Sequence, residues 1–169
     1  LVHGIEPNMR WRAFCSDILE VADDLEVELV VNLGALLADV PHTRPVPLTG
    51  FASAPELIAD LGLEESGYEG PTGIVGVLQH TCDMSGMPSV SLWAAVPHYV
   101  SQSPCPKAAL ALLNRLEDIT ATTITTSELA DEAAAWQRGV EEMAEEDEEV
   151  REYVERLERA RDSALPTPM

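Results

Sequence analysis

VELVVNL, residues 27–33, is the stretch that decides the fold class, because it is a nearly unbroken run of β-branched and aliphatic residues. Such a run is typical of an interior, parallel strand that is covered on both faces. The preceding segment, residues 10–25, carries apolar residues at the spacing of one helix face, namely Trp11, Phe14, Cys15, Ile18, Ala22 and Leu25. The sequence therefore predicts a helix that leads into a buried strand.

Helical and extended patterns continue to alternate after this strand. The predicted elements are a proline-punctuated loop at 41–50, a short helix at 53–62, a helix at 72–85 that ends at Gly86, a strand at 89–96, and a helix that Ser103 caps with Pro104 at its first position. This alternation predicts an α/β fold with a mostly parallel or mixed sheet and helices on both faces.

The C-terminal part of the sequence has the pattern of a charged helical arm. Apolar residues recur there at alternating steps of four and three, and only Asp147 interrupts the seam, which comprises Leu129, Ala133, Trp136, Val140, Met143, Val150, Val154 and Leu157. A lone helix leaves such a seam exposed, so we predict a homo-oligomer, with a trimer as one candidate. Asp147 could instead cap a second helix and so produce a hairpin. The arm could also fold onto its own body.

These patterns predict how the chain is divided. We expect an α/β body at 1–126, an acidic helical arm or helical hairpin at 127–162, and a flexible tail at 163–169. The first four residues, LVHG, have the pattern of a strand end entering a turn. We therefore expect the body to lack an N-terminal portion.

The balance of charge excludes several classes of partner. The net charge is −20, and seven of the nine residues from 141 to 149 are acidic. Such a chain repels phosphate backbones, so we predict no binding to nucleic acid or to anionic membranes. The acidic run is either a docking surface for a basic partner or a solvated helix face.

The cysteines and the apolar segments indicate a cytoplasmic protein. Cys15, Cys82 and Cys105 form no C-x-x-C pair, which argues against a structural disulfide and fits a reducing cytoplasm. The apolar runs are too short and too interrupted to span a bilayer. The first residues also lack the pattern of a signal peptide.

Polar residues near the predicted strand ends are candidates for a ligand pocket, because open α/β sheets bind ligands there. The candidates are Glu6, Arg10, Asn32, His42, Arg44, Gly73 and His98. Such a pocket would suit a carboxylate or phosphate ligand. Structural pairing, for example of Glu6 with Arg10, is the alternative explanation for these residues.

Other chemical motifs are weak. The glycine-rich loop at 67–73 could cradle an anion at a helix start, but it lacks the spacing and the lysine of a P-loop. His80 and Cys82 lie about 200° apart on a helix, so one metal ion could not easily take both. We therefore predict no metal and no cofactor. We assign no catalytic residues, because the sequence contains neither a G-x-S-x-G elbow nor a recognisable Cys–His dyad.

Four segments carry a resemblance to a known family. They are GIEPNMRW at 4–11, VPHTRP at 40–45, YEGPTGI at 68–74 and SLWAAVPHY at 91–99. Together they resemble the actinobacterial branch of the proteasome assembly chaperone 2 family, and the acidic segment at 136–157 is similar as well. The resemblance rests on the ordered series of segments rather than on one motif.

This resemblance implies a three-layer α/β/α fold shaped like the nucleoside phosphorylases. It also implies a non-catalytic assembly-chaperone-like or protein-interaction protein, because eukaryotic members are chaperones for proteasome α-subunits and archaeal members form homo-oligomers. Proteasome subunits are therefore candidate partners. The alternative is a small-molecule- or phosphate-binding protein, or an enzyme with a phosphorylase- or hydrolase-like fold, although a shared shape does not establish an activity.

Overall fold

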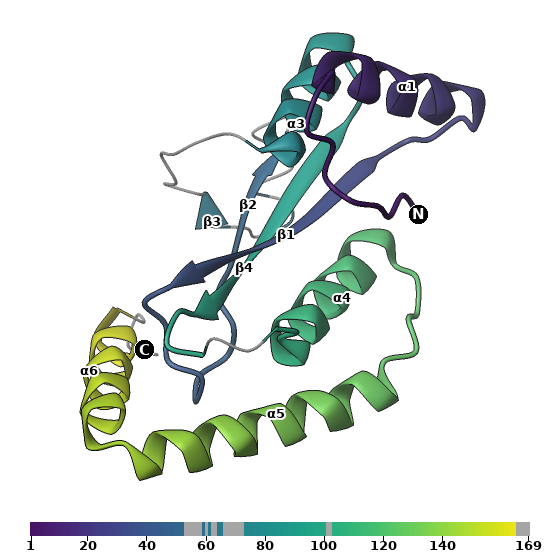
Figure 1. Ribbon diagram of the computed structural model, residues 1–169. Coiled ribbons are helices and arrows are strands. Elements are labelled where there is room, and N and C mark those ends of the chain that lie inside the picture. The colour runs from purple at the N-terminus through teal and green to yellow at the C-terminus, as the bar shows by residue number, and fades with distance from the viewer. Residues whose placement is uncertain (53–58, 60, 62–63, 66–72, 101–102, 165–169) are drawn as a thin grey trace. The chain divides into compact units, whose positions relative to one another are not determined.

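The computed structural model describes residues 1–52, 59, 61, 64–65, 73–100 and 103–164 of the chain (Figure 1). The chain forms two compact units. The first unit comprises Leu1–Gly34 and Thr49–Leu92, and the second unit comprises Ala35–Leu48 and Trp93–Met169. Strands β1 and β4 each contribute residues to both units.

A four-stranded sheet with mixed strand directions forms the β part of the fold. Its strand order is β1-β4-β2-β3, with β1 at Val30–Ala38, β4 at Ser89–Pro97, β2 at Leu48–Ala52 and β3 at Glu64–Glu65. Strands β2 and β3 are parallel. The Ala95 N–H near the end of β4 donates to the Pro47 carbonyl just before β2, at 3.0 Å, so β4 and β2 run in opposite directions.

Strands β1 and β4 run parallel. At their starts the Val30 N–H donates to the Pro88 carbonyl at 3.0 Å, and at their ends the His98 N–H donates to the Ala38 carbonyl at 3.2 Å. Because both partners advance along the chain together, the pair is parallel. The predicted α/β fold with a mixed sheet, flanking helices and a C-terminal helical region is confirmed.

The prediction that the strand over 27–33 is interior is wrong for the described part of the chain. Strand β1 begins at Val30 and stands at one end of the strand order. Asn32 is buried, whereas Leu33 and Leu37 are exposed. Aliphatic and β-branched residues favour a strand whether one or both faces are covered, so composition alone does not place a strand inside a sheet.

Two helices pack together in the first unit (Figure 1). They are α1 at Trp11–Asp24 and α3 at Ile74–Ser85, and Cys15, Leu78 and Cys82 form the buried core that they share. Gly86 ends α3 in the left-handed conformation, with φ of 76°, as the sequence predicts. Leu25, predicted on the buried face of the first helix, is instead 70% exposed because it follows the last helical turn.

Two predicted elements fall largely or wholly outside the described residues. The short helix at 53–62 is described only at residues 59 and 61. The glycine-rich loop at 67–73 is described only at Gly73, which precedes α3 with extended backbone. Both predictions stay untested.

Three helices follow β4 in the second unit, and each packs on the next along the chain. They are α4 at Pro106–Thr120, α5 at Ser127–Glu146 and α6 at Glu148–Ala164. The first of them begins two residues later than predicted. Cys105 keeps extended backbone as the residue before a proline, and Pro106 rather than Pro104 occupies the first helical position.

Asp147 separates the last two helices. Its Oδ1 accepts hydrogen bonds from the backbone N–H groups of Glu149 at 2.9 Å and Val150 at 3.3 Å. This is the capped arrangement that the sequence offered as an alternative to one continuous helix. The division into a body at 1–126 and an arm at 127–162 stays a prediction.

Candidate functional site

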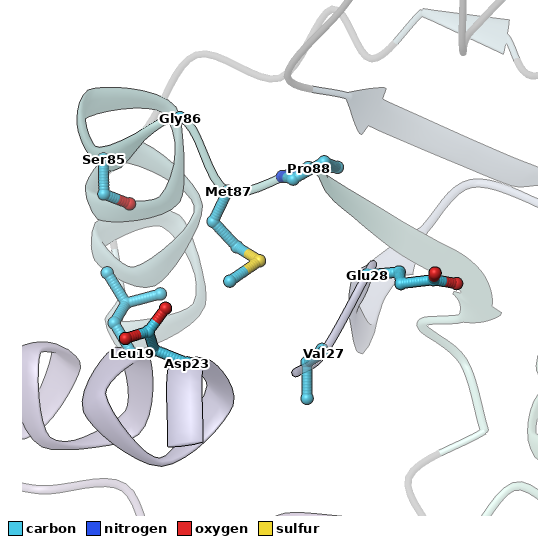
Figure 2. Close-up of a pocket in the computed structure, with 8 residues that line it drawn as sticks. All are labelled: Leu19, Asp23, Val27, Glu28, Ser85, Gly86, Met87 and Pro88. Atoms are coloured by element: carbon cyan, nitrogen blue, oxygen red, sulfur yellow. The ribbon is translucent and has the colours of Figure 1, made fainter. Parts of the chain in front are cut away.

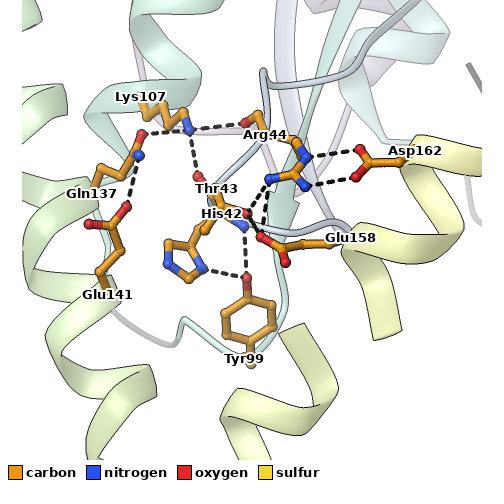
Figure 3. A network of polar contacts seen from close by, with 9 residues as sticks. All are labelled: His42, Thr43, Arg44, Tyr99, Lys107, Gln137, Glu141, Glu158 and Asp162. Atoms are coloured by element: carbon orange, nitrogen blue, oxygen red, sulfur yellow. Dashed lines mark hydrogen bonds and ion pairs between the residues drawn. The ribbon is translucent and has the colours of Figure 1, made fainter. Parts of the chain in front are cut away.

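A clamp fastens the loop before β2 to α6 (Figure 3). Arg44 donates from Nε to Asp162 Oδ1 at 2.9 Å and from Nη2 to Asp162 Oδ2 at 2.8 Å. Its Nη1 donates to Glu158 Oε1 at 3.1 Å, and the Thr43 hydroxyl donates to that same oxygen. We call Thr43, Arg44, Glu158 and Asp162 the Arg44 clamp. Hydrogen bonds from Arg44 lower the pKa of the Asp162 carboxyl.

Lys107 ties this loop to two further helices. It is the sole lysine of the sequence and lies in the first turn of α4. Its Nζ donates to the carbonyls of His42 and Arg44, the latter at 3.0 Å, and to Gln137 Oε1 on α5 at 2.8 Å. Burial lowers the pKa of its ammonium group. All three ammonium protons therefore have protein partners, which leaves none for a ligand.

His42 belongs to this same loop and is only 3% exposed. Its backbone N–H donates to the Tyr99 hydroxyl at 2.8 Å, and its Nδ1 lies 2.8 Å from the same oxygen. Burial lowers the pKa of the imidazole and raises the pKa of Tyr99 to about 12. His42 Nε2 is buried without a hydrogen-bond partner among the described residues.

His98 belongs to an aromatic cluster beside His42. Its Nδ1 lies 3.1 Å from Asp39 Oδ1, which also accepts a hydrogen bond from the Tyr153 hydroxyl at 3.0 Å. The rings of Tyr99 and Tyr153 meet edge to face, with 5.8 Å between centroids. This cluster is a second contact between the end of the sheet and α6. Of the seven pocket candidates, His42, Arg44 and His98 thus come together in the second unit.

In the first unit, Glu6 and Gly73 come together at the start of α3. The Glu6 carboxylate accepts a hydrogen bond from the Ile74 N–H at 3.0 Å, which satisfies a free donor of the first helical turn. A Cβ atom at Gly73 would lie 3.3 Å from that carboxylate. Arg10 precedes α1 in the left-handed conformation, with φ of 59°. In the described part of the chain Glu6 forms no ion pair with Arg10.

Asn32 lies in a buried chain of polar groups between β1, β4 and α3. Its Nδ2 donates to Ser91 Oγ at 3.4 Å, and Ser91 Oγ donates to Gln79 Oε1 at 2.8 Å. Gln79 Nε2 donates to Ser89 Oγ at 2.7 Å. These groups satisfy one another, as buried polar groups must. Asn32 therefore takes part in the hydrogen bonds that join two strands to a helix. The role of Asn32 in ligand binding stays a prediction.

The seam of the arm is partly covered by the chain itself. Val140 and Val154 are buried, and Met143 remains exposed. The other candidates, Leu129, Trp136, Val150 and Leu157, are partly buried. Because α5 packs on α4, the body of the second unit covers part of the seam. Its role in oligomer formation stays a prediction.

The sequence patterns did not identify four residues that organise this site: Tyr99, Lys107, Glu158 and Asp162. Glu158 and Asp162 are four residues apart and therefore share a helix face, but nothing in a helix rich in acids distinguishes them. Lys107 could have been found because it is the sole lysine. Among the described residues, no group of three or more His, Cys, Asp or Glu side chains could hold a metal ion. No described helix is long and apolar enough to cross a membrane.

The profile of the PAC2 family matches residues 1–144, and the chain belongs to this family. The crystal structure of a PAC2 family protein from Streptomyces avermitilis is similar to it, with 62% sequence identity and a TM-score of 0.82. A proteasome-assembly chaperone homologue from Mycobacterium tuberculosis shares 54% identity with a TM-score of 0.81. Each match covers 89% of this chain, but only 63% and 64% of the respective relatives. This chain therefore spans less than two thirds of their length.

A more distant similarity concerns the fold alone. An archaeal homologue of proteasome-assembly chaperones, from Pyrococcus furiosus, shares 19% identity with a TM-score of 0.65. The match covers 93% of this chain and 65% of the archaeal protein. No curated protein matches this chain.

Proposed function

We propose that this chain acts as a non-catalytic, assembly-chaperone-like protein that works through contacts with other proteins. Membership of the PAC2 family is the observation that carries the proposal. The relative from Mycobacterium tuberculosis, itself a proteasome-assembly chaperone homologue, supports it at 54% identity. Proteasome subunits are accordingly the proposed partners, and the cytoplasm is the proposed location.

The geometry of the second unit also supports a structural role for the most polar part of the site. Arg44 and Lys107 direct their donors at protein acceptors rather than at an open pocket. Charge-assisted and bidentate hydrogen bonds of this kind fix geometry. The loop at 41–47 is therefore held in one position against the helices that follow, as a rigid platform for a partner requires.

A small-molecule or phosphate ligand is the alternative function. The Nε2 atom of His42 favours it, because a buried imidazole nitrogen without a partner in the described chain leaves a hydrogen bond unmade. A ligand that bonds to Nε2 would change the chemical shifts of the His42 ring. Titration of the isotope-labelled chain with inorganic phosphate and with nucleosides separates this alternative from the main proposal.

Self-association is the second part of the proposal. Met143 is exposed on the seam of the arm, and the partly buried seam residues around it provide further apolar surface. A homo-oligomer, with a trimer as one candidate, would cover this surface. Light scattering at micromolar concentration tests it: a multiple of the 18.3 kDa chain mass supports the oligomer, and the mass of one chain contradicts it.

The partner is tested by capture of purified proteasome α- and β-subunits on the immobilised chain. We expect retention of α-subunits from a mixture that also contains an unrelated acidic protein. The matched control is the same surface carrying the chain unfolded and carbamidomethylated at its cysteines, which has the same sequence and net charge without the fold. Equal retention on both surfaces, or none on either, contradicts the proposal.

A further inference from the structure

An open hollow lies in the first unit, between the C-terminal ends of two helices and the starts of two strands (Figure 2). Its volume is about 650 Å³. Its apolar residues are Leu19 from α1, Val27 before β1, and Met87 and Pro88 before β4. Figure 2 shows the Met87 side chain reaching into the space between Leu19 and Val27. The floor of the hollow is therefore aliphatic and suits an aliphatic side chain.

The rim of the hollow is negatively charged. Asp23 and Glu28 line it, and both side chains are exposed to solvent. Both α1 and α3 end there, and the C-terminus of a helix carries a partial negative charge that favours cations. Neither helix has a basic residue in its last turn. Two carboxylates and two helix C-termini thus lie at this place, and the last turn of neither helix supplies a basic residue.

Large apolar side chains stand exposed on the same two helix ends. Val21 is 53% exposed, Leu25 follows α1 at 70%, and Met84 near the end of α3 is 76% exposed. Single exposed apolar residues of this kind are ordinary, and none of these three side chains lines the hollow itself. An uncharged apolar occupant would leave the acidic rim unpaired. A cationic segment would satisfy the rim and cover the apolar floor.

We propose that this hollow is a docking site for a basic segment of a partner protein, in which one aliphatic side chain is flanked by arginine or lysine. The aliphatic side chain occupies the floor formed by Leu19, Val27 and Met87. The flanking cations lie against Asp23 and Glu28, with their methylene stems over the edge of the apolar floor. The inference rests on the proposed function as a protein-binding chain and adds to it the chemistry of the partner.

The experiment uses a defined probe, the peptide acetyl-Gly-Arg-Leu-Arg-Gly-amide, and the chain with isotope-labelled Leu, Val and Met methyl groups. We expect saturable chemical-shift changes at Leu19, Val27 and Met87 on titration. The Met143 methyl, which lies within the acidic run at 141–149, should not follow them. One control peptide replaces both arginines by glutamine, and the other replaces the leucine by serine. Each should bind at least about threefold more weakly, because the first lacks the cations that pair with the rim and the second lacks the aliphatic side chain that contacts the floor.

A pair of variants with equal charge change tests the residues. We expect D23N/E28Q to weaken binding of the peptide about fivefold, since each exposed ion pair contributes modestly. The matched control, D17N/E20Q, removes two exposed carboxylates from earlier positions of α1 and should leave binding unchanged. The methyl spectrum of each variant shows whether the fold is retained. Equal weakening by both variants, or larger shifts at Met143 than at Met87, overturns the inference.

Other occupants give other results in the same experiment. Equal binding of the glutamine peptide means an apolar ligand site. Concentration-dependent shifts of the Leu19, Val27 and Met87 methyl groups without peptide mean that a second copy of the chain occupies the hollow. Both results contradict the inference. The inference about the hollow and the proposed function can fail independently of each other. Capture of α-subunits that D23N/E28Q does not reduce leaves the proposed function intact and shows that the partner uses another surface.

Discussion

Arg44 and Asp162 lie 118 residues apart in the sequence and form a two-bond contact in which both carboxylate oxygens accept from one guanidinium group, at 2.9 and 2.8 Å. This contact joins the loop before β2 to the last turns of α6. Glu158 adds a third bond to the same guanidinium group. The helical C-terminal segment is thereby fixed to the sheet-bearing part of its own unit, which is one of the arrangements that the sequence left open.

Replacing Arg44 by lysine should weaken the contact between α6 and the loop before β2. Lysine keeps the charge but cannot make the bidentate contact with Asp162. We expect faster amide hydrogen exchange over 148–164 in R44K, measured by mass spectrometry, and a larger effect at low salt than at high salt because the pair is partly exposed. R115K is the matched control, since the ion pair of Arg115 is with Asp118, three residues later in its own helix. Equal exchange in the two variants would contradict the role of the clamp.

Acid should weaken the same contact. The pKa of Asp162 is lowered in the folded chain, chiefly by the hydrogen bonds from Arg44. Because the carboxyl binds its proton more weakly in the folded chain, its contact with Arg44 adds stability at pH values above the unfolded pKa near 3.8. This stability is lost as the pH falls through the lower pKa of the folded chain. The protection of the α6 amides, taken relative to exchange of the unfolded chain at the same pH, should therefore fall below about pH 4 in the wild type. R44K should show a smaller loss of protection, and an identical pH profile would argue against the pair.

Removing the cap of α6 should destabilise the second unit. The Asp147 carboxylate accepts hydrogen bonds from two backbone N–H groups of the first turn, those of Glu149 and Val150. We expect D147A to lower the free energy of unfolding by about 1 kcal/mol in urea titrations. D147N should retain most of the wild-type stability, because asparagine also caps helices. Equal losses in the two variants would show that the charge rather than the cap matters.

Two tyrosines provide a matched test of burial. The Tyr99 hydroxyl meets both the backbone N–H and the Nδ1 of His42, and it is held in a buried site. Y99F leaves those groups unsatisfied and should cost about 1–3 kcal/mol of stability. Y153F removes a hydrogen bond to the exposed Asp39 and should cost well under about 1 kcal/mol. Thermal unfolding measures both, and the reverse order would contradict the described geometry.

Protonation of His42 should destabilise the fold. Its pKa is lowered from 6.5, first because burial disfavours the charged imidazole. The unfolded chain then takes up the proton first, so this stabilising effect is complete above about pH 6.5 and decreases as pH falls below that value. Titration of the His42 ring by NMR should give a lower pKa in the native chain than in the chain unfolded by urea. An equal or higher native pKa would be inconsistent with a buried neutral ring.

Local patterns in the sequence predicted the elements whose formation depends mainly on neighbouring residues. The helix over α1 follows from its apolar spacing, and the end of α3 follows from Gly86, which takes the left-handed conformation with little strain. Strand β2 was missed, because its five residues follow three closely spaced prolines in a segment that reads as loop. Short strands depend on their partners more than on their own composition.

The site was predicted only in part for a similar reason. The segment 40–45 contributed His42 and Arg44, which do lie together, but their partners Tyr99, Glu158 and Asp162 come from distant parts of the chain. A helix with many carboxylates gives no sign of which two an arginine will meet. Long-range pairing of this kind is a property of tertiary packing, so only the structure identifies it.

Sedimentation velocity of the fluorescently labelled chain with purified proteasome α-subunits tests the central claim most directly. If the chain acts through protein contacts, the labelled chain should move in a faster boundary of fixed stoichiometry when α-subunits are added at micromolar concentration. An unrelated protein of similar size should cause no such change. Independent sedimentation of the chain and the α-subunits at every ratio, together with saturable binding of phosphate or a nucleoside to the chain, would contradict the claim and favour the ligand-binding alternative.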